Sequence, residues 1–554
     1  MEVFGLPILN IISLLGMFGL CAIAWIFSEN RRLKYFPWRV VIGGIGLQLL
    51  LGALVFVVPG AREGLQVFSN ILNSVFDAAD VGARFVFGPN IVPPVGTAPA
   101  VDLGYIFAFR ALPTVIFFGG LMALLYNIGI IQIVTDFFAK IFYSTMRLSG
   151  AESLSGAANI FVGIEAAIVV KPFLAKMTRS ELCAILACCF GTSASSVLAI
   201  YVSFLRPVFP NILAHLVSAS IIGIPACFVL SKILVPETEV PLTAGGIPQE
   251  EDLRDFSADG TPEDSPQTVM GEPISKESPL DAAIAGALDG VRMAVGIAAV
   301  LILILGLVAL VNQVFDGLAA VPGPVGMVFQ YVTLQNIMGA LFLPLTVLTG
   351  VSLDWPELWQ ASVLIGRRLF ETAIPSYQAL GALGESGAVT DRTILIVSYA
   401  LSGFAHLASV GIFVGGTAAL IPSRRRDIAE MGWKALFVGT LATLMIACVA
   451  GVFDNGSPTV LGQPTADPPA VLEPDPADLE ETVPPQDAEA EINTVPTETL
   501  SDPAAEPALE TSPAEELPPA NSPETSPEAG QGTGTEPPAV EALPADVGVP
   551  ADGG

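Results

Sequence analysis

The chain has 554 residues, of which 52% are hydrophobic and 14% are charged, and its formal net charge is −29. Several apolar runs reach the length of about 20 residues with which a helix crosses a bilayer, so we predict an all-α polytopic membrane protein. The excess of acidic residues argues against nucleic-acid binding, which needs clustered lysine and arginine. The sequence has no P-loop, nucleophile–base pair or metal-hydrolase motif, and we therefore expect no enzymatic activity.

The negative charge is concentrated in two segments that are rich in proline and poor in apolar residues. Residues 237–280 contain 11 acidic and two basic residues, and residues 454–554 contain 22 acidic residues and no lysine or arginine. Such segments cannot bury enough apolar surface to fold, so we predict a disordered loop and a disordered tail. The rest of the chain is then nearly neutral.

The N-terminal part, residues 1–105, predicts two spans, at about 6–27 and 40–58, joined by a loop with four basic residues. Basic loops remain in the cytoplasm, so the N-terminus is expected outside it, and the count of spans places the C-terminus outside as well. Residues 62–88 mix polar with apolar residues, which is typical of a helix that lies in the membrane interface.

Two later parts of the chain, residues 106–236 and 281–453, share one order of elements. Each opens with a span and an amphipathic helix, followed by a broken apolar hairpin, a long apolar helix interrupted near its middle, a proline and one further span. The predicted bounds are 105–131, 132–148, 151–181, 182–205 and 211–234 in the first part, and 284–312, 328–350, 360–381, 393–420 and 432–453 in the second. The sequence thus predicts about eight transmembrane helices, two re-entrant hairpins and interfacial helices. Such inverted repeats indicate a transporter with a site at the membrane midplane.

The first hairpin contains polar residues where a membrane protein rarely has them. Its centre, residues 157–170, is apolar except for Asn159, Glu165 and a glycine, Gly163. A carboxylate at membrane depth is expensive and points to function, and the run is too short for an ordinary span. We therefore predict a segment that turns near Gly163 and leaves the membrane on the side where it entered, buried in protein or lining a wet cavity. The alternative is that Glu165 ends a frayed interfacial helix.

The cysteine and histidine content argues against a metal centre. All six cysteines lie in apolar segments, where we expect small buried hydrophobic residues rather than disulfides or zinc ligands. The chain has only two histidines, His215 and His406.

Several stretches resemble a known family. They are AWIFSENRR at 24–32, FDAADVGARFVFG at 76–88, SGAANIFVGIEAAIVVKPFLAKMTRSEL at 155–182, ILVPE at 233–237 and SGFAHLASVGIFVGGTAALIPSRRRDIAEMGWKALFVGTLA at 402–442. Over about residues 8–453 the chain is similar to the concentrative nucleoside transporters, which are cation-coupled nucleoside symporters. The resemblance implies eight spans, two re-entrant hairpins, usually a trimer, and a transport domain that moves against a fixed scaffold.

The resemblance also implies a substrate site at the first hairpin. The family usually reads G-Q-T-E-A-P there, with the glutamine, threonine and glutamate contacting the nucleobase. This chain has Gly163-Ile164-Glu165, with isoleucine in place of glutamine and one residue missing. Glu165 is the match to the family glutamate.

The second hairpin and the second long helix complete the implied site. The family usually has Asn-Glu-Phe-Val-x-Tyr in the second hairpin, and the aligned Thr372-Ala373 lacks the carboxylate that binds ribose hydroxyls. Glu371 could replace it only with a shifted backbone. In the long helix the family's G-F-A-N-x-x-S becomes GFAHLAS, with His406 in place of asparagine and the serine kept as Ser409.

The implied cation site is closer to the family pattern. Asn159 and the carbonyl of Val162 match the hairpin ligands, and Ser196 and Val197 are the partners in the long helix. Oxygen ligands without thiolate or imidazole suit a hard monovalent cation. We expect Na+ or H+ as the coupling cation and no other cofactor.

Some residues have a second interpretation. His406 is either a substrate donor or proton-coupling group, because histidine titrates near neutral pH, or a helix residue bonded to a neighbouring carbonyl. Glu165 either binds substrate or carries a coupling proton. Arg367 and Arg368 are interpreted as side chains that snorkel to the interface.

Together these features predict a secondary active transporter that imports a nucleoside or nucleoside-like solute by symport with Na+ or H+ and elevator-type alternating access. It is expected to be a homotrimer in a bacterial inner membrane, with membrane lipid as its other partner. The altered hairpins keep a second class open, namely a receptor or scaffold that retains the fold without transport. The two classes differ in whether a bound ligand is translocated.

Overall fold

The computed structural model describes residues 2–3, 6–93, 106–246, 278–456 and 461. The chain divides into two compact units, residues 1–473 and 474–554, and every described residue lies in the first. Helices dominate the described part, whose only strands are the paired β1 (Glu2–Val3) and β2 (Leu6–Pro7). Most of the residues predicted to be disordered, in 237–280 and 454–554, lie outside the described part. Residues 279–280 are described and helical, so the predicted loop is too long by at least these two residues, with which α13 begins.

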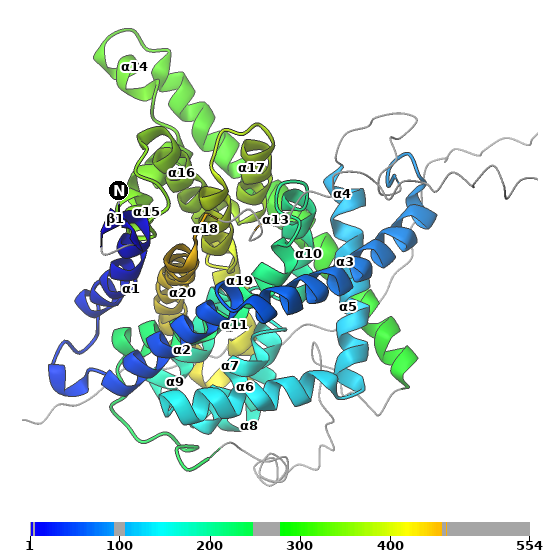
Figure 1. The fold of residues 1–554 in the computed structure, drawn as a ribbon, viewed down its shortest axis with the longest axis vertical. Helices are drawn as coiled ribbons and strands as arrows, with labels where there is room; N and C mark the ends of the chain where they lie inside the picture. The colour runs from blue at the N-terminus through cyan, green and yellow to red at the C-terminus, as the bar shows by residue number, and fades with distance from the viewer. Residues whose placement is uncertain (1, 4–5, 94–105, 247–277, 457–460, 462–554) are drawn as a thin grey trace, which may run out of the picture. The chain divides into compact units, whose positions relative to one another are not determined.

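Six helices in the described part are long and apolar enough to cross a membrane (Figure 1). They are α1 (Ile8–Ile26), α2 (Trp38–Phe56), α4 with α5 (Phe107–Arg110 and Leu112–Asn127), α11 (Ile212–Leu234), α13 (Pro279–Ala319), and η3 with α20 (Pro422–Arg424 and Arg425–Phe453). The other two predicted spans are broken helices. They are α9 with α10 (Arg179–Gly191 and Ser195–Leu205) and α18 with α19 (Asp391–Leu401 and Leu407–Leu420). The predicted polytopic helical fold is confirmed.

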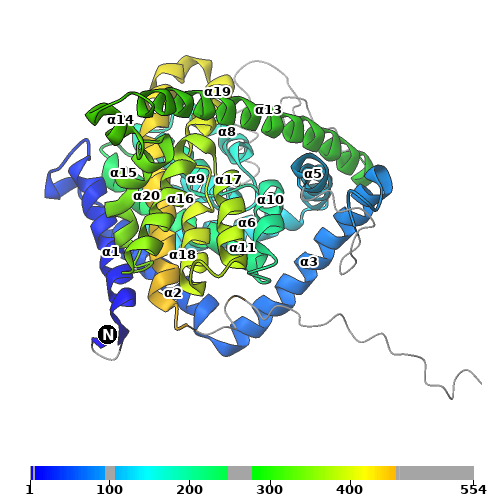
Figure 2. The same cartoon turned by 90° about the horizontal axis from the view of Figure 1, so that it is seen from above.

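Shorter or amphipathic helices occupy the positions predicted for interfacial elements. They are α3 (Pro59–Phe87), α6 (Ile130–Met146) and α15 (Leu334–Leu348). Two short helices were not predicted, namely η1 (Leu33–Tyr35) in the loop after α1 and α14 (Pro324–Phe329), which ends where the predicted third helix begins. The helix α3 runs diagonally past the bundle of the other helices in Figure 2. Each of the three longer helices begins or ends within a few residues of its predicted bounds.

The two hairpins differ in how they turn. Hairpin 1 consists of α7 (Gly150–Ala158), the 3₁₀ helix η2 (Ile164–Val170) and α8 (Lys171–Leu174). Hairpin 2 consists of α16 (Trp355–Glu371) and α17 (Ile374–Glu385). It turns at Thr372, whose φ of +70° is rare for a residue with a Cβ and indicates local strain.

Capping residues fix where the hairpins and broken helices begin. Ser149 and Glu152 form a capping box at the start of α7, and Thr178 and Glu181 form another at the start of α9. Thr390 caps α18 by accepting a hydrogen bond from the backbone amide of the third helical residue. Serine or threonine followed three residues later by glutamate is the sequence signature of such a start.

The two broken helices meet at their breaks. The backbone amide of Phe404 donates to the carbonyl of Thr192 at 3.3 Å, and Ser193 Oγ donates to the carbonyl of Ser402. A Cβ on Gly403 would lie 2.8 Å from the carbonyl oxygen of Phe190, so only glycine allows this approach. Two segments more than 200 residues apart thus place their free backbone groups together.

The helices α5 and α13 form a separate pair. They pack along each other, and a Cβ on Gly119 of α5 would lie 2.6 Å from the carbonyl oxygen of Gly286 of α13. Small residues let membrane helices approach this closely. Only 17% of the most apolar window of α13 is buried, so most of this helix presents apolar side chains outward. Figure 2 shows α13 along one edge of the bundle.

Candidate solute and cation site

Asn159 of hairpin 1 has an unsatisfied side-chain oxygen near the first break, which is the interruption between α9 and α10. It is fully buried at the end of α7, its Nδ2 donates to the carbonyl of Ser155 at 3.1 Å, and its main-chain oxygen accepts from Thr192 Oγ1 at 3.1 Å. Its Oδ1 is buried and accepts no hydrogen bond within the described part of the chain. A buried acceptor without a partner costs about 1–3 kcal/mol, which a bound cation would remove.

Of the other predicted cation residues, Val162 lies in hairpin 1, and Ser196 and Val197 follow the break between α9 and α10. The backbone of Val162 belongs to the turn of hairpin 1, where its amide donates to the carbonyl of Ala158 at 3.2 Å. Ser196 and Val197 lie in the first turn of α10, although the side chain of Ser196 is outside the described residues. Thr192, which was not predicted as a site residue, bonds hairpin 1 to this break through the main-chain oxygen of Asn159. Its position in the polar interruption FGTSASS was the available signal.

The turn of hairpin 1 lies against the second broken helix. The segment η2 packs against α19, which begins beside His406. Gly163 is buried, whereas the side chains of Ile164 and Glu165 are outside the described residues. The structure therefore packs the first predicted substrate segment against the helix that follows His406, and it does not test the role of Glu165.

His406 and Ser409 form one hydrogen-bonded unit. His406 caps α19, because its Nδ1 accepts from the backbone amide of Ser409 at 3.3 Å. The Ser409 hydroxyl lies 3.0 Å from Nε2 of the same ring. Both residues are buried. The ring thus contacts an amide and a hydroxyl, and the hydrogen bond from the amide requires an unprotonated Nδ1.

At hairpin 2 the acidic residue next to the turn is already engaged. One oxygen of Glu371 accepts from Gln335 of α15 at 2.6 Å, and the other accepts from Arg367 at 2.7 Å. Thr372 and Ala373, which form the turn, are buried. The Thr372 hydroxyl accepts from the backbone amide of Ile374 at 3.4 Å, and the carboxylate of Glu371 is directed at α15 and at its own helix.

The expectation that Arg367 and Arg368 both snorkel to the interface is wrong for Arg368. Its side chain is 1% exposed and donates to the carbonyl of Ala400 and, at 3.0 Å, to Thr443 Oγ1. Successive residues of a helix point about 100° apart, so the two adjacent arginines of α16 point in different directions. Arg367 faces Glu371, and Arg368 faces the second break, which is the interruption between α18 and α19.

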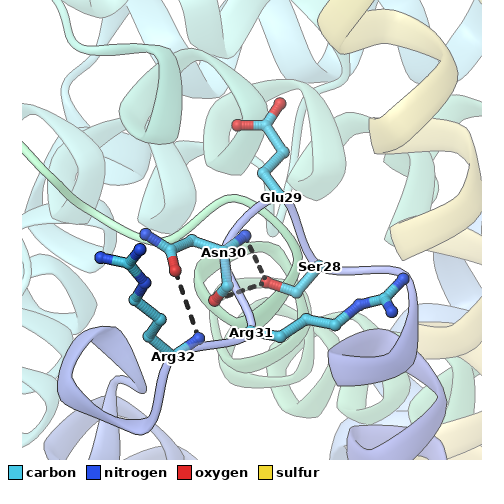
Figure 3. Close-up of a pocket in the computed structure, with 5 residues that line it drawn as sticks. All are labelled: Ser28, Glu29, Asn30, Arg31 and Arg32. Atoms are coloured by element: carbon cyan, nitrogen blue, oxygen red, sulfur yellow. Dashed lines mark hydrogen bonds between the residues drawn. The ribbon is translucent and has the colours of Figure 1, made fainter.

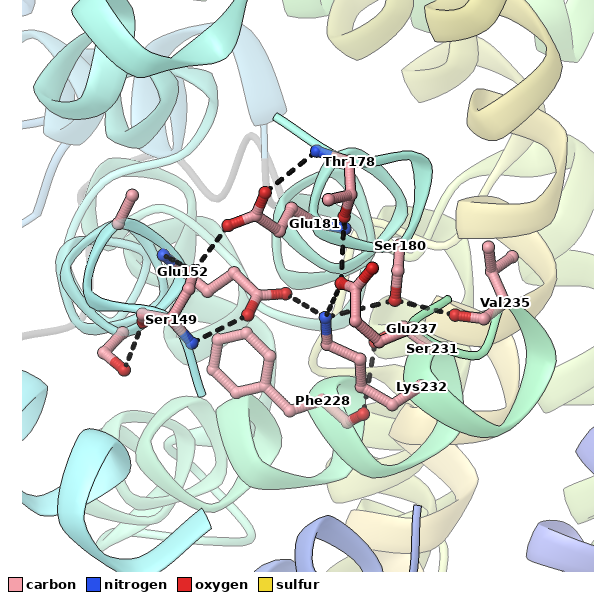
Figure 4. A network of polar contacts seen from close by, with 12 residues as sticks. Ser149, Glu152, Thr178, Ser180, Glu181, Phe228, Ser231, Lys232, Val235 and Glu237 are labelled. Carbon is pink, nitrogen blue, oxygen red and sulfur yellow. Dashed lines mark hydrogen bonds and ion pairs between the residues drawn. The ribbon is translucent and has the colours of Figure 1, made fainter. Parts of the chain in front are cut away.

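A buried ion pair attaches hairpin 1 to α11. The ammonium of Lys232 lies 2.5 Å from Glu152 Oε1, and it donates to Ser180 Oγ at 3.1 Å and to Glu237 at 3.3 Å (Figure 4). Lys232 comes from the end of α11 and Glu152 from the start of α7. This network escaped the sequence analysis, since a lysine near the end of an apolar span is usually a snorkelling residue.

A second buried carboxylate extends this network. Glu181 accepts from Ser149 Oγ at 2.6 Å and from the backbone amide of Thr178 at 2.9 Å. The start of hairpin 1 is thereby bonded to the start of α9. In the second repeat, Thr390 donates to Glu357 of α16 from both its amide and its hydroxyl. Each hairpin is therefore fastened to its own broken helix by a carboxylate.

A surface hollow lies away from these residues. It measures about 780 Å³, belongs to the loop between α1 and α2, and is lined by Ser28, Glu29, Asn30, Arg31 and Arg32 (Figure 3). A hollow of about 70 Å³ separates this loop from the start of α9. Neither contains a predicted solute or cation residue. The candidate site is defined by its polar residues and helix breaks, and the charged hollow on the loop is a separate surface feature.

The fold and the site together define a class. A polytopic helical body with two re-entrant hairpins and two helices broken opposite each other is the architecture of a secondary transporter. Free backbone groups at such breaks bind ions and the polar groups of solutes.

Comparison with known proteins gives the family. The chain matches the models of the N-terminus (residues 15–90) and C-terminus (residues 215–451) of the Na+ dependent nucleoside transporters, and a nucleoside recognition model over residues 108–208. It is 36% identical over 448 residues to an uncharacterized transporter of Haemophilus influenzae, covering 80% of this chain and 97% of the relative. It is 31% identical over 448 residues to the nucleoside permease NupC of Helicobacter pylori, covering 80% and 98%.

Solved structures of similar proteins point to the same family. The structure of CNTnw in an inward-facing substrate-bound state superposes with a TM-score of 0.68 at 34% identity, covering 80% of this chain and 98% of CNTnw. The chain belongs to the Na+-dependent nucleoside transporter family, as the resemblance predicted. This is a family of multi-pass membrane transporters and not of enzymes.

Proposed function

We propose that this chain imports a nucleoside or nucleoside-like solute by symport with Na+. The observation that supports Na+ most directly is the buried, unpartnered Oδ1 of Asn159 at the first break. The proposed ligands are Asn159, the Val162 carbonyl, Ser196 and Val197. An oxygen-only set of this kind favours a hard cation over a proton carrier.

The proposed solute site lies between the two hairpin turns and α19. Its residues are Gly163, Ile164, Glu165, Thr372, Ala373, His406 and Ser409. Glu371 supports hairpin 2 from behind, because both of its oxygens are engaged by Gln335 and Arg367. A site without a second-hairpin carboxylate should bind ribose hydroxyls weakly, so we propose a solute recognised mainly through its base or a base-like ring.

We also propose that the hairpins and broken helices move as one body against a scaffold. The scaffold contains α5 and α13, whose close packing and outward apolar surface favour assembly with further copies and with lipid. The solved relative CNTnw has structures in outward-facing, intermediate and inward-facing states, which supports this mode of transport. The proposed moving body consists of the hairpins and broken helices within residues 106–236 and 281–453, without α5 and α13, and the loop 237–280 and tail 454–554 lie outside it.

The proposed assembly is a homotrimer in a bacterial inner membrane with both termini outside the cytoplasm. The basic loop after α1 and the cluster Arg424–Arg426 support this orientation, since both would then face the cytoplasm. Cysteine accessibility to a membrane-impermeant reagent, at positions placed in the loop and in the tail, tests it directly.

Uptake into proteoliposomes tests the function. Labelled uridine, adenosine and hypoxanthine are offered with an inward Na+ gradient, an inward H+ gradient or neither. Accumulation driven by Na+ supports the proposal. Accumulation driven only by H+ would replace Na+ by a proton and direct attention to Glu165 and His406. Ligand-dependent thermal stabilisation without uptake under any gradient would favour the receptor or scaffold.

A further inference from the structure

Arg368 is a buried positive charge without a carboxylate partner. No ion pair among the described residues includes it, and the nearby carboxylate of Glu371 is paired with Arg367. The Nε of Arg368 is also buried without a hydrogen-bond acceptor in the described chain. An isolated charge is strongly unfavourable in a protein interior, so its surroundings must supply negative charge in another form.

The carbonyl end of α18 supplies this negative charge. Arg368 donates to the carbonyl of Ala400, and Tyr377 of the same hairpin donates to the carbonyl of Ser398 at 2.7 Å. Both carbonyls lie in the last turn of α18, directly before the second break. The carbonyl end of a helix carries a partial negative charge and groups without intrahelical partners. The guanidinium therefore lies at the negative end of a helix that stops inside the protein.

The first repeat makes the corresponding contact with the opposite chemistry. Hairpin 1 reaches the end of α9 through Asn159, whose main-chain oxygen accepts from Thr192 Oγ1. Thr192 Oγ1 also donates to the carbonyl of Cys188 in the last turn of α9 at 2.9 Å. There the hairpin contributes the unsatisfied oxygen of Asn159, whereas at the second break it contributes an unsatisfied N–H of Arg368.

We propose that Arg368 is a built-in cation at the second break, which does for hairpin 2 and α18 what the coupling cation does for hairpin 1 and α9. The comparison with the coupling cation rests on the proposed function. The second break then needs no ion from solution, so hairpin 2 stays attached to α18 whether or not the coupling cation is bound. Only the contact of hairpin 1 with the first break depends on cations. Arg368 is a positioning residue that acts through α18.

Chemical rescue tests this directly. Purified protein is unfolded thermally in detergent and choline chloride, without sodium or solute. Arg368→Ala is expected to lower the Tm, and guanidinium at millimolar concentration, far below denaturing levels, is expected to restore most of the loss. Urea, which has a similar planar shape and no charge, is expected to restore none. An equal response to both compounds, or no response to guanidinium, would overturn the proposal.

Two further variants decide the case if Arg368→Ala does not fold. Arg368→Lys keeps a positive charge and is expected to have a Tm near that of the wild type. Arg368→Met keeps the length of the side chain without its charge and is expected to be much less stable. A methionine variant as stable as the lysine variant would overturn the proposal. Arg292→Ala removes an arginine whose side chain is 75% exposed; it is the control, and guanidinium is expected not to change its Tm.

The same measurement separates this inference from the proposed function. Replacing choline chloride by NaCl is expected to raise the Tm of the wild type and of Arg368→Ala. When Asn159→Ala is added to either protein, NaCl is expected not to raise the Tm. Guanidinium rescue without any sodium effect would support the role of Arg368 while contradicting Na+ coupling. A sodium effect without guanidinium rescue would contradict the role of Arg368 alone.

Discussion

Lys232 and Glu152 form an ion pair of 2.5 Å in which both side chains are almost completely buried. Lys232 belongs to α11 and Glu152 to the first turn of hairpin 1, so the pair fixes one end of the hairpin to a membrane-spanning helix (Figure 4). The free-energy cost of burying the two charges is compensated by their mutual attraction. If one partner is removed, the other remains buried without a counter-charge.

Lys232→Met should therefore destabilise the protein by about 3–5 kcal/mol, the usual consequence of leaving one member of a buried pair alone. Thermal or denaturant unfolding in detergent measures the change. The double variant Lys232→Met with Glu152→Gln should recover part of the loss, since the remaining group is then neutral. A single variant that unfolds like the wild type would show that this ion pair does not stabilise the fold.

A carboxylate also fastens hairpin 2, and this contact should depend on pH. Thr390 donates to one oxygen of Glu357 from its amide at 2.7 Å and from its hydroxyl at 2.8 Å. Burial alone would raise the pKa of Glu357, but these hydrogen bonds, together with those from the side chains of Ser352 and Thr393, outweigh it and lower the pKa below the ordinary value of 4.5. A lowered carboxyl pKa stabilises the fold above the ordinary value, and that stability is lost as the pH falls through the folded-state value.

Glu357→Gln should thus lower the Tm at neutral pH, and the difference from the wild type should shrink below a pH of about 4.5. The measurement is the Tm of both proteins across this range. Glu385→Gln, at an exposed position of the same hairpin, is the control and should leave the Tm nearly unchanged. A difference that stays constant with pH would mean that ionisation of Glu357 does not stabilise hairpin 2.

The cation site predicts a specific loss of Na+ dependence. Asn159→Ala removes the unpartnered Oδ1 at the first break, which should weaken Na+ binding about tenfold or more, the equivalent of about 1.4 kcal/mol. The Na+ concentration that gives half-maximal uptake measures the effect. Asn336→Ala removes an exposed amide that bonds the carbonyl of Tyr331, and it should leave the Na+ dependence unchanged. Equal Na+ dependence in both variants would place the cation elsewhere.

At the strained turn of hairpin 2, a substitution is expected to keep or raise the stability of the fold, unlike the substitutions at Lys232 and Glu357. Thr372 has a φ of +70°, which costs a residue with a Cβ about 1–3 kcal/mol and which glycine adopts freely. Thr372→Gly should keep or raise the Tm while lowering uptake, because the hydroxyl proposed to face the solute is lost. Thr393→Ser is a control at a buried threonine in α18. A large drop in Tm for Thr372→Gly would mean that the side chain, not the backbone, holds the turn.

The sequence was sufficient to predict the elements whose signal is local. Polar residues inside short apolar runs revealed hairpin 1, and the T-x-x-E pattern at Thr178 marks the start of α9. Interruptions by small residues gave both breaks. The predicted start of hairpin 2 was late, because the amphipathic helix α16 already begins at Trp355.

Contacts between distant segments could not be predicted in this way. Nothing local to Lys232 indicates Glu152, which lies 80 positions earlier in the chain. Nothing local to Arg368 separates it from Arg367, because the direction of each side chain depends on the helices that pack around α16. The contact of Phe404 with Thr192 likewise depends on the crossing of the two broken helices.

The missing carboxylate of hairpin 2 gives the last prediction. The family resemblance implies that Ala373 aligns with the glutamate that usually binds ribose hydroxyls, and the oxygens of Glu371 are engaged by Gln335 and Arg367. The wild type should therefore transport uridine and 2′,3′-dideoxyuridine with similar kcat/KM. A hydrogen bond to a charged group contributes about 1.5–3 kcal/mol, so Ala373→Glu should favour uridine by about 10–100-fold. Ala373→Gln is the matched control and should favour it less. Strong preference for uridine in the wild type would show that another residue, with His406 the first to test, already binds the ribose hydroxyls.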